Sequence, residues 1–330
     1  MQAQNESGRQ EIRVEKLEAA FARALVAAQE FEGATAPNPP VGCVILDAQG
    51  RELAVAAHQK AGQPHAEALA IQKCREAGTG DRIHTLIVTL EPCNHHGRTP
   101  PCCDAILSTP AKHIWIGTVD PNPTVQGNGA GRLQAAGVDV KFWPDREMAN
   151  RLIAPFAKLR STGLPFVTVK QALSRDGSMI PPAGQKTFTS QSSLVLAHKL
   201  RKRADAILTG SGTVLADASL FNVRHVPDFP GKRRKLVLLD RRQRVSDSYR
   251  VGATGRGFDV VSAQSIEQAL EIMGAVGALE LLVEAGPQLT HSILASKLWD
   301  EHVIIQETAG EDEISILENT DKGSHVLRHH

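Results

Sequence analysis

The stretch LEPCNHHGRTPPCCDAI, residues 90–106, contains three cysteines and two histidines within seventeen positions. Such a stretch can form a disulfide-linked corner, a structural metal site or part of a catalytic metal site. The chain holds five cysteines, an odd number, and its polar first residues, MQAQNESGRQEIRVEK, lack the apolar core of a signal peptide. We therefore expect a cytoplasmic protein with reduced thiols, and a metal site rather than disulfides.

A second segment, PHAEA at residues 64–68, supplies the other half of the predicted metal site. His65 is expected at a helix start, Cys93 at a strand end and Cys102 at a second helix start. Positions near helix N-termini stabilise thiolates, which makes both cysteines suitable ligands. One imidazole and two thiolates bind Zn²⁺ and leave the fourth position for water, which is the arrangement of a catalytic zinc site.

Glu67 lies two residues after His65, where a carboxylate can accept a proton from water and return it to a leaving amine. The order His-x-Glu, Pro-Cys and a second cysteine is typical of zinc deaminases, although here eight residues rather than two separate the cysteines. Taken singly, the same residues are ordinary: a helix-capping histidine, a buried thiol and a solvated acid. Cys103 adjoins Cys102, and the spacing leaves open which of the two faces the metal.

Strands and helices alternate along the chain in two series. In the first, helices are expected at 15–30, 65–78 and 102–110, strands at 41–46, 85–92 and 113–123, and a helix followed by a strand within 129–143. This alternation predicts a layered α/β domain at 15–147. A connecting helix at 146–165 leads to a second alternating series, a domain at 164–310, and the acidic residues 311–330 are expected to form a polar tail.

Composition argues against several classes of partner. The 37 Lys+Arg balance 36 Asp+Glu and only 4% of residues are aromatic, so neither a basic field nor stacking side chains favour nucleic acid. No apolar run approaches the roughly 18–20 residues that span a bilayer. We therefore expect a small-molecule substrate, and neither a nucleic-acid nor a membrane partner.

Several motifs together resemble the bifunctional deaminase/reductase family of riboflavin biosynthesis. They are TAPNPPVGCVI, PHAEALAI, VTLEPCNHHGRTPPCCDAI, VDPNP and GNGAGRLQAAGVDV in the first half, and FVTVKQALSRDG, LRKRADAILTGSGTVLAD and VEAGPQL in the second. The resemblance implies an α/β fold with an N-terminal cytidine-deaminase-like three-layer domain and a C-terminal dihydrofolate-reductase-like domain. It implies Zn²⁺-dependent deamination of 2,5-diamino-6-ribosylamino-4(3H)-pyrimidinone 5′-phosphate, then NADPH-dependent reduction of the ribosyl group to ribityl, in a homo-oligomer.

The resemblance also implies roles for individual residues. In the first half it selects Cys102 as the second thiolate ligand and assigns Asn38 and His58 to the substrate's ring. It suits Arg98 to the substrate's phosphate or to charge at the reacting centre. In the second half, two turns that follow strands would bind the nucleotide, through the positions Thr209, Gly210, Ser211, Gly212, Glu284 and Gly286. The family's substrate positions in that half are Lys170, Arg201, Asp217 and Arg224.

The second half also departs from the family pattern. QKTFTS stands in place of S-x-W-I-T, ADAS in place of ADDP, and an alanine replaces the first of two glycines before Pro287. An alternative prediction is therefore a deaminase whose degenerate second domain serves as a binding or oligomerisation scaffold. A non-catalytic, zinc-stabilised binding protein, in which the fourth coordination position is closed, is the alternative from another class.

Overall fold

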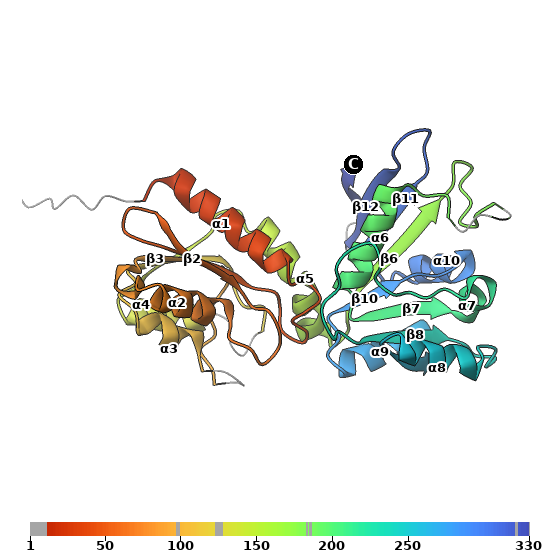
Figure 1. Ribbon diagram of the computed structural model, residues 1–330, viewed down its shortest axis with the longest axis horizontal. Helices are drawn as coiled ribbons and strands as arrows, with labels where there is room; N and C mark the ends of the chain where they lie inside the picture. The colour runs from red at the N-terminus through yellow and green to blue at the C-terminus, as the bar shows by residue number, and fades with distance from the viewer. Residues whose placement is uncertain are drawn as a thin grey trace, which may run out of the picture. The chain divides into compact units, whose positions relative to one another are not determined.

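The computed structural model divides the chain into two compact units, Met1–Ala157 and Lys158–His330. It describes residues 12–96, 100–122, 128–182, 184, 187–320 and 323–329. Each unit is an α/β structure built on a sheet of its own (Figure 1). Among the described helices, none combines the length and the apolar character required to cross a bilayer.

The first unit contains a five-stranded sheet in the order β2-β1-β3-β4-β5. Its strands are β1 (Gly42–Leu46), β2 (Glu52–Ala57), β3 (Thr85–Leu90), β4 (His113–Thr118) and β5 (Asp139–Phe142). β1 pairs antiparallel with β2 and β3, whereas β3, β4 and β5 are parallel. β3 is buried along its whole length, as expected of an apolar strand covered on both faces. β2, with the alanine-rich sequence ELAVAA, is a strand that the sequence did not predict.

Helices cover both faces of this sheet and make the three-layer structure that the family resemblance implied. They are α1 (Val14–Gln29), α2 (Ala66–Glu76), α3 (Cys102–Leu107), α4 (Asn128–Ala135) and α5 (Glu147–Thr162). α1 and α5 pack on the face that carries Val44 and Ile87. α2, α3 and α4 pack on the other face, around Ile45 and Val88. The N-termini of these three helices converge on the segment that follows β3.

The second unit contains an eight-stranded sheet in the order β13-β12-β11-β6-β10-β7-β8-β9. Its strands are β6 (Phe166–Leu173), β7 (Ala206–Gly210), β8 (Arg234–Leu239), β9 (Phe258–Ala263), β10 (Glu280–Val283), β11 (Glu301–Gln306), β12 (Glu313–Thr320) and β13 (Gly323–His329). The strands from β11 to β9 are parallel, and β12 pairs antiparallel with β11 and β13. The turns after the neighbouring strands β6, β10 and β7 therefore lie side by side at the carboxyl ends of the strands. Ligands usually bind at these ends in open α/β sheets.

Helices also cover both faces of the second sheet. They are α6 (Gln191–Arg203), α7 (Ser211–Asp217), α8 (Asp247–Gly255), α9 (Ile266–Ala275) and α10 (Pro287–Ser296). The first three pack around one apolar core that includes Ile207 and Leu236. α9 and α10 pack around a second core that includes Leu208 and Val237. Successive residues of β7 and of β8 thus point to opposite layers, as the pleat of a strand requires.

The residues from 311 onward differ from the polar tail that the sequence predicted. Residues 313–320 form β12 on the edge of β11, and residues 323–329 form β13. Ile314 and Ile316 pack against one core of the second unit and Leu317 against the other. The acidic composition conceals this alternation of apolar side chains. The edge of β11 supplies the backbone hydrogen bonds that a tail of this composition could not make alone.

Gly42, the first residue of β1, allows α1 to approach the sheet closely. A Cβ atom at Gly42 would lie 1.9 Å from the carbonyl oxygen of Ala24 in α1. We predict that Gly42→Ala lowers the free energy of unfolding by about 1–3 kcal/mol, the usual cost of overpacking. The measurement is the midpoint of urea unfolding followed by tryptophan fluorescence. Gly131→Ala, where a Cβ meets no atom within 4 Å, is the control; equal midpoints for the two variants would contradict the close packing.

Candidate active site

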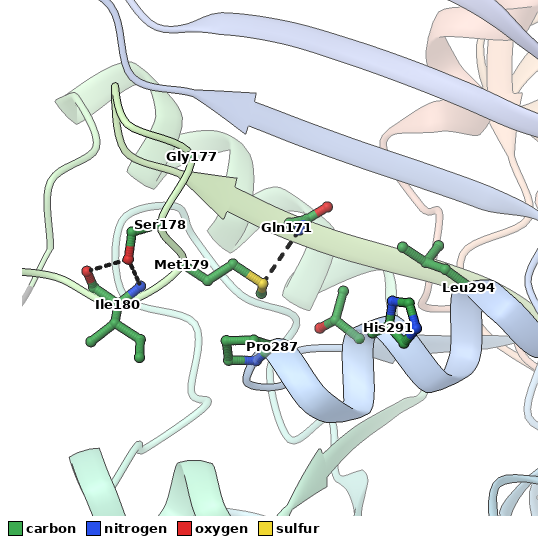
Figure 2. A pocket seen from close by; sticks show the side chains of 9 residues that line it. Gln171, Gly177, Ser178, Met179, Ile180, Pro287, His291 and Leu294 are labelled. Carbon is green, nitrogen blue, oxygen red and sulfur yellow. Dashed lines mark hydrogen bonds between the residues drawn. The ribbon is translucent and has the colours of Figure 1, made fainter.

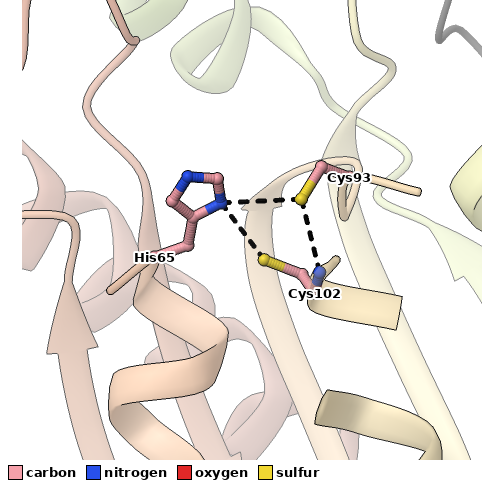
Figure 3. Close-up of side chains that lie close together, drawn as sticks. All are labelled: His65, Cys93 and Cys102. Carbon is pink, nitrogen blue, oxygen red and sulfur yellow. Dashed lines mark hydrogen bonds between the residues drawn. The ribbon is translucent and has the colours of Figure 1, made fainter. Parts of the chain in front are cut away.

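Three side chains from separate segments meet beyond the end of β3, as Figure 3 shows. His65 directly precedes α2 in an extended conformation, with φ −69° and ψ 163°. Cys102 is the first residue of α3, and Cys93 lies in the loop that follows β3. The predicted helix starts at His65 and Cys102 are therefore confirmed, and they aim an imidazole and a thiol at the same point.

The potential ligand atoms form a compact triangle. His65 Nδ1 lies 3.2 Å from Cys102 Sγ and 3.6 Å from Cys93 Sγ, and all three atoms lie within 4.8 Å of one another. Zn–N and Zn–S bonds of about 2.1 and 2.3 Å at tetrahedral angles separate nitrogen from sulfur by about 3.6 Å. The triangle therefore fits one tetrahedral Zn²⁺. In the part of the chain that the structure describes, it is the one such group of His, Cys, Asp or Glu.

The two thiols of the triangle differ in acidity. A hydrogen bond from the Cys102 thiol lowers the pKa of Cys93 to about 4; burial opposes this shift and His65 supports it. The same hydrogen bond raises the pKa of Cys102, because the pair shares a proton. The backbone N–H of Cys102 also donates to Cys93 Sγ at 3.3 Å. Cys93 is thus held as a thiolate, the form in which cysteine binds metals.

Glu67 lies in the first turn of α2 and is only 3% exposed. Burial raises the pKa of its carboxyl group, the charge of Cys93 raises it further, and His65 lowers it. Burial favours the neutral form of a carboxyl group, and a carboxyl group in such a site can both accept and release a proton. The acid at this position is therefore desolvated, unlike the ordinary surface acid of a helix start.

Asn38 and His58 lie beside the triangle. The Asn38 amide nitrogen is 3.3 Å from His58 Nε2, and His58 Nδ1 is 3.2 Å from the Pro64 carbonyl oxygen. The rings of His58 and His65 are 5.1 Å apart. A carbonyl only accepts, so His58 Nδ1 donates to it and Nε2 accepts from the asparagine; burial lowers the pKa of His58, which keeps the ring neutral. Arg98, the third predicted substrate residue here, lies outside the described residues.

Cys103 points away from the triangle and into the core. Its Sγ lies 3.8 Å from the carbonyl oxygen of Pro92 and 3.7 Å from that of Gly129. Burial raises the pKa of its thiol to about 12. Cys43 and Cys74 belong to the same core. Geometry thus resolves the choice that spacing left open, because only the first cysteine of the adjacent pair faces His65.

A buried ion pair lies at the carboxyl end of β10 in the second sheet. Arg201 of α6 donates to both carboxylate oxygens of Glu284, at 2.8 and 2.6 Å, and the two side chains are 14% and 6% exposed. Burial would raise the pKa of Glu284, but the charges of Arg201 and Lys170 lower it to about 2. Three residues predicted for substrate and nucleotide are therefore brought together, with the Arg201 guanidinium directed at Glu284.

The turns after β7 and β10 are tied together by a hydrogen bond from the Gly286 N–H to Thr213 Oγ1, at 3.0 Å. Gly210, Ser211 and Gly212 form the junction of β7 and α7. The Thr209 hydroxyl in β7 is buried and has no hydrogen-bond partner within the described ranges. A buried hydroxyl without a partner costs free energy that a bound ligand can offset. The orphan hydroxyl fits the predicted cofactor position.

His198 connects Arg224 to the Arg201–Glu284 ion pair. The Arg224 backbone N–H donates to His198 Nδ1 at 2.9 Å, and His198 Nε2 lies 3.4 Å from Arg201. Burial, followed by the charge of Arg201, lowers the pKa of His198 to about 4, so the ring is neutral. Sequence pattern did not point to this histidine, because it belongs to an ordinary helical pattern. Asp217, exposed at the last position of α7, makes no hydrogen bond or ion pair with this group in the described structure.

A cavity of about 390 Å³ lies between α10 on one side and β6 with the chain that follows it on the other (Figure 2). Its lining consists of Gln171, Gly177, Ser178, Met179, Ile180, Pro287, Thr290, His291 and Leu294. The Gln171 amide donates to the Met179 sulfur at 3.3 Å. Pro287, the first residue of α10, connects this cavity to the turn that contains Gly286. The sequence did not indicate this cavity, because its lining residues come from two distant segments.

Comparisons with known proteins agree with both halves. Residues 14–118 match the cytidine and deoxycytidylate deaminase zinc-binding region, and residues 165–307 match the RibD C-terminal domain. The riboflavin biosynthesis protein RibD of Aquifex aeolicus (strain VF5) is 34% identical, covering 85% of this chain and 84% of that protein. The riboflavin biosynthesis protein RibD of Escherichia coli (strain K12) is 35% identical, covering 86% and 85%.

Solved structures agree over most of the chain. A diaminohydroxyphosphoribosylaminopyrimidine deaminase/5-amino-6-(5-phosphoribosylamino)uracil reductase from Thermotoga maritima has a TM-score of 0.80 at 29% identity, covering 94% of this chain and 97% of that chain. Acinetobacter baumannii RibD, form 1, has a TM-score of 0.76 at 30% identity, covering 91% and 89%. Fold and site thus define a zinc-binding deaminase domain joined to a reductase domain. The chain belongs to the RibD family of riboflavin biosynthesis proteins.

The adjacent cysteines allow a matched test of the ligand set. We predict that Cys102→Ser loses bound zinc after dialysis against a chelator, because a hydroxyl is a poorer zinc ligand than a thiolate. Cys103→Ser should retain about one zinc per chain, since its sulfur faces the core, at a cost of about 1–3 kcal/mol in stability for the buried hydroxyl. Metal analysis measures both, and zinc loss in Cys103→Ser alone would contradict the geometry.

Proposed function

We propose that the chain catalyses two consecutive steps of riboflavin biosynthesis. Its first domain hydrolyses the ring 2-amino group of 2,5-diamino-6-ribosylamino-4(3H)-pyrimidinone 5′-phosphate and releases ammonia. Its second domain reduces the ribosyl group of that product to a ribityl chain with NADPH. The observation that carries the proposal is the zinc-compatible spacing of His65, Cys93 and Cys102 beside the buried Glu67, in a member of the RibD family.

The deaminase half assigns a separate task to each residue. His65, Cys93 and Cys102 hold Zn²⁺, which when bound lowers the pKa of water to about 7 and so supplies hydroxide at neutral pH. Glu67 takes the proton from the attacking water and delivers it to the departing amine. Because the amide nitrogen of Asn38 donates to His58, its oxygen is left to accept an N–H of the pyrimidine ring.

The remaining assignments concern the phosphate and the second domain. Arg98 suits the phosphate of the substrate in the deaminase site, because a guanidinium matches phosphate geometry. In the reductase, the turns that contain Gly210–Gly212 and Gly286 bind NADPH, which supplies the hydride. Lys170 and Arg224 present positive charge to the substrate, and Asp217 is assigned to the ribose because it matches the family position. Arg201 acts through Glu284, whose charge it stabilises.

A deaminase with a degenerate second domain is the other candidate. One departure from the family pattern has a local cost: Ala218 adopts a left-handed conformation with φ 45°, which suits Gly, Asn or Asp better than Ala. The buried Arg201–Glu284 pair and the unpartnered Thr209 hydroxyl favour an active reductase, because a scaffold gains nothing from either. Oxidation of NADPH upon addition of the deaminated product distinguishes the two candidates.

We also propose that the protein is a cytoplasmic homo-oligomer that binds neither nucleic acid nor membranes. Its five cysteines are free, as expected in a reducing compartment, and its charge is balanced. β9 and β13 stand at the two edges of the second sheet, and a strand edge can pair with a second copy. Light scattering after size-exclusion chromatography measures the oligomeric state.

Glu67 is the position at which deamination can be separated from metal binding. We predict that Glu67→Gln lowers the rate of ammonia release by about 10²–10⁴-fold, because the amide cannot carry the proton. Zinc content should not change, since Glu67 is not a ligand. Glu76→Gln, on the exposed end of the same helix, is the matched control and should retain full activity. Full deaminase activity in the Glu67→Gln protein would contradict the proposed mechanism.

Thr209→Val replaces the orphan hydroxyl with a methyl group of the same shape. We predict that the ligand-free protein is as stable as the unchanged protein or more so, because no internal hydrogen bond is lost. The Kd for NADPH should rise about tenfold, which corresponds to one hydrogen bond of about 1.4 kcal/mol. Isothermal titration measures the Kd.

Thr168→Val is the control for Thr209→Val, because the Thr168 hydroxyl does have an internal hydrogen-bond partner. Its hydroxyl donates to Glu280 at 2.8 Å, so this substitution should lower stability and leave the Kd for NADPH unchanged. A Thr209→Val protein that loses stability and binds NADPH normally would show that the hydroxyl has a structural role. Absence of NADPH binding in the unchanged protein would instead favour the degenerate second domain.

A further inference from the structure

Glu91 is a buried acid that the proposed chemistry does not use. It is 4% exposed and lies two residues before the ligand Cys93. Its Oε1 accepts the backbone N–H of Ala130 at 3.0 Å, and its Oε2 accepts that of Asp120 at 3.3 Å. Ala130 is in the first turn of α4, where backbone N–H groups have no helical partner. Glu91 thus caps α4 from a segment 39 residues away.

The residue after Glu91 also packs tightly against α4. A Cβ atom at Gly129 would lie 1.9 Å from the carbonyl oxygen of Pro92, so only glycine permits this approach. The Cys103 thiol contacts the carbonyl oxygens of both Pro92 and Gly129. The chain that leads into Cys93 is therefore fixed by a carboxyl group, a close backbone contact and a buried thiol.

Arg132, two residues after Ala130 in α4, connects the two ligand segments. Its guanidinium donates to Asn94 Oδ1 at 2.7 Å and to Asp104 Oδ1 at 2.5 Å. Asn94 directly follows Cys93, and Asp104 lies two residues after Cys102. One side chain of α4 therefore restrains the distance between the segments that carry the two sulfurs.

We propose that Glu91 and Arg132 are positioning residues that hold the two sulfur ligands at the separation required by zinc, with α4 as their common support. The proposal rests on the zinc site of the proposed deaminase. Neither side chain belongs to the ligand triangle; each acts through the segments around Cys93 and Cys102. Residues that orient metal ligands typically change metal affinity by about 10–100-fold when substituted.

The test compares zinc affinity in four full-length proteins: the unchanged chain, Glu91→Gln, Arg132→Gln and Asp47→Asn. Asp47 is the matched control. It is 2% exposed, and one of its carboxylate oxygens accepts two backbone N–H groups, of Gln49 and Arg51. It follows β1 at the end of the sheet where β3 begins, whereas the triangle lies beyond the end of β3. Competition with a chromophoric chelator gives the Kd for zinc, and the visible absorption of bound Co²⁺ reports the ligand geometry.

We expect Glu91→Gln to weaken zinc binding by about 10–100-fold, because the amide places an N–H donor opposite a backbone N–H. Arg132→Gln should weaken it by about tenfold, and both should alter the Co²⁺ spectrum. Asp47→Asn should stay within about twofold of the unchanged protein, although it too loses stability. Equal effects in Asp47→Asn and Glu91→Gln would overturn the proposal, since they would indicate general destabilisation.

Unchanged zinc affinity in Glu91→Gln would also overturn it. Where Glu91→Gln does not fold, Arg132→Gln decides alone, because Arg132 lies at the surface with its side chain 39% exposed. An unchanged chain that binds no zinc would contradict the proposed deaminase itself. Failure of the positioning role and failure of the proposed function therefore give different results.

Discussion

The first domain depends on the convergence of one imidazole and two sulfurs at the end of β3. Two of the three come from helix starts, so α2 and α3 direct their positive ends toward the triangle. These partial charges stabilise the Cys93 thiolate, whose burial would otherwise be unfavourable. The layered fold is therefore a requirement of the site as well as its support.

The second domain balances charge with side chains instead of helix ends. The charges of Arg201 and Lys170 lower the pKa of Glu284 to about 2. The carboxylate of Glu284 therefore keeps its charge through the physiological pH range. Removing one member of a buried pair of this kind costs about 3–5 kcal/mol, because the other charge remains without compensation. The pair therefore couples α6 to the turn after β10. This coupling gives the predicted nucleotide turn a fixed position before any ligand binds.

The sequence predicted the metal triangle because imidazole, thiolates and a nearby acid are chemically distinctive at that spacing. It could not choose between Cys102 and Cys103 from the residues alone, because their orientation depends on the packing of α3. Glu91 and Arg132 gave no signal, since their partners are backbone groups or side chains of other segments. Arg201 and Glu284 were both predicted, yet as binders of different ligands, because 83 residues separate the two members of the pair.

The secondary structure was predictable where the hydrophobic periodicity was strong. Prediction failed where the composition concealed that periodicity. The apolar β3 and the amphipathic α1 followed directly from pattern. β2 was missed because alanine has little strand preference, and β12 because acidic residues surround its isoleucines. Both strands gain their stability from pairing with neighbours already in place. Such tertiary stabilisation is absent from any local window of sequence.

The distribution of departures from the family pattern bears on the activity of the second domain. Ala218 is exposed, and Phe188 and Ser219 are partly so. In contrast, the polar groups whose burial costs folding free energy lie in the interior. They are the Arg201–Glu284 pair and the Thr209 hydroxyl. Apolar replacement of such groups is often neutral or stabilising, so a domain freed from catalysis has a physical route to greater stability by losing them. That the chain keeps them is a physical argument that the second site still binds its ligands.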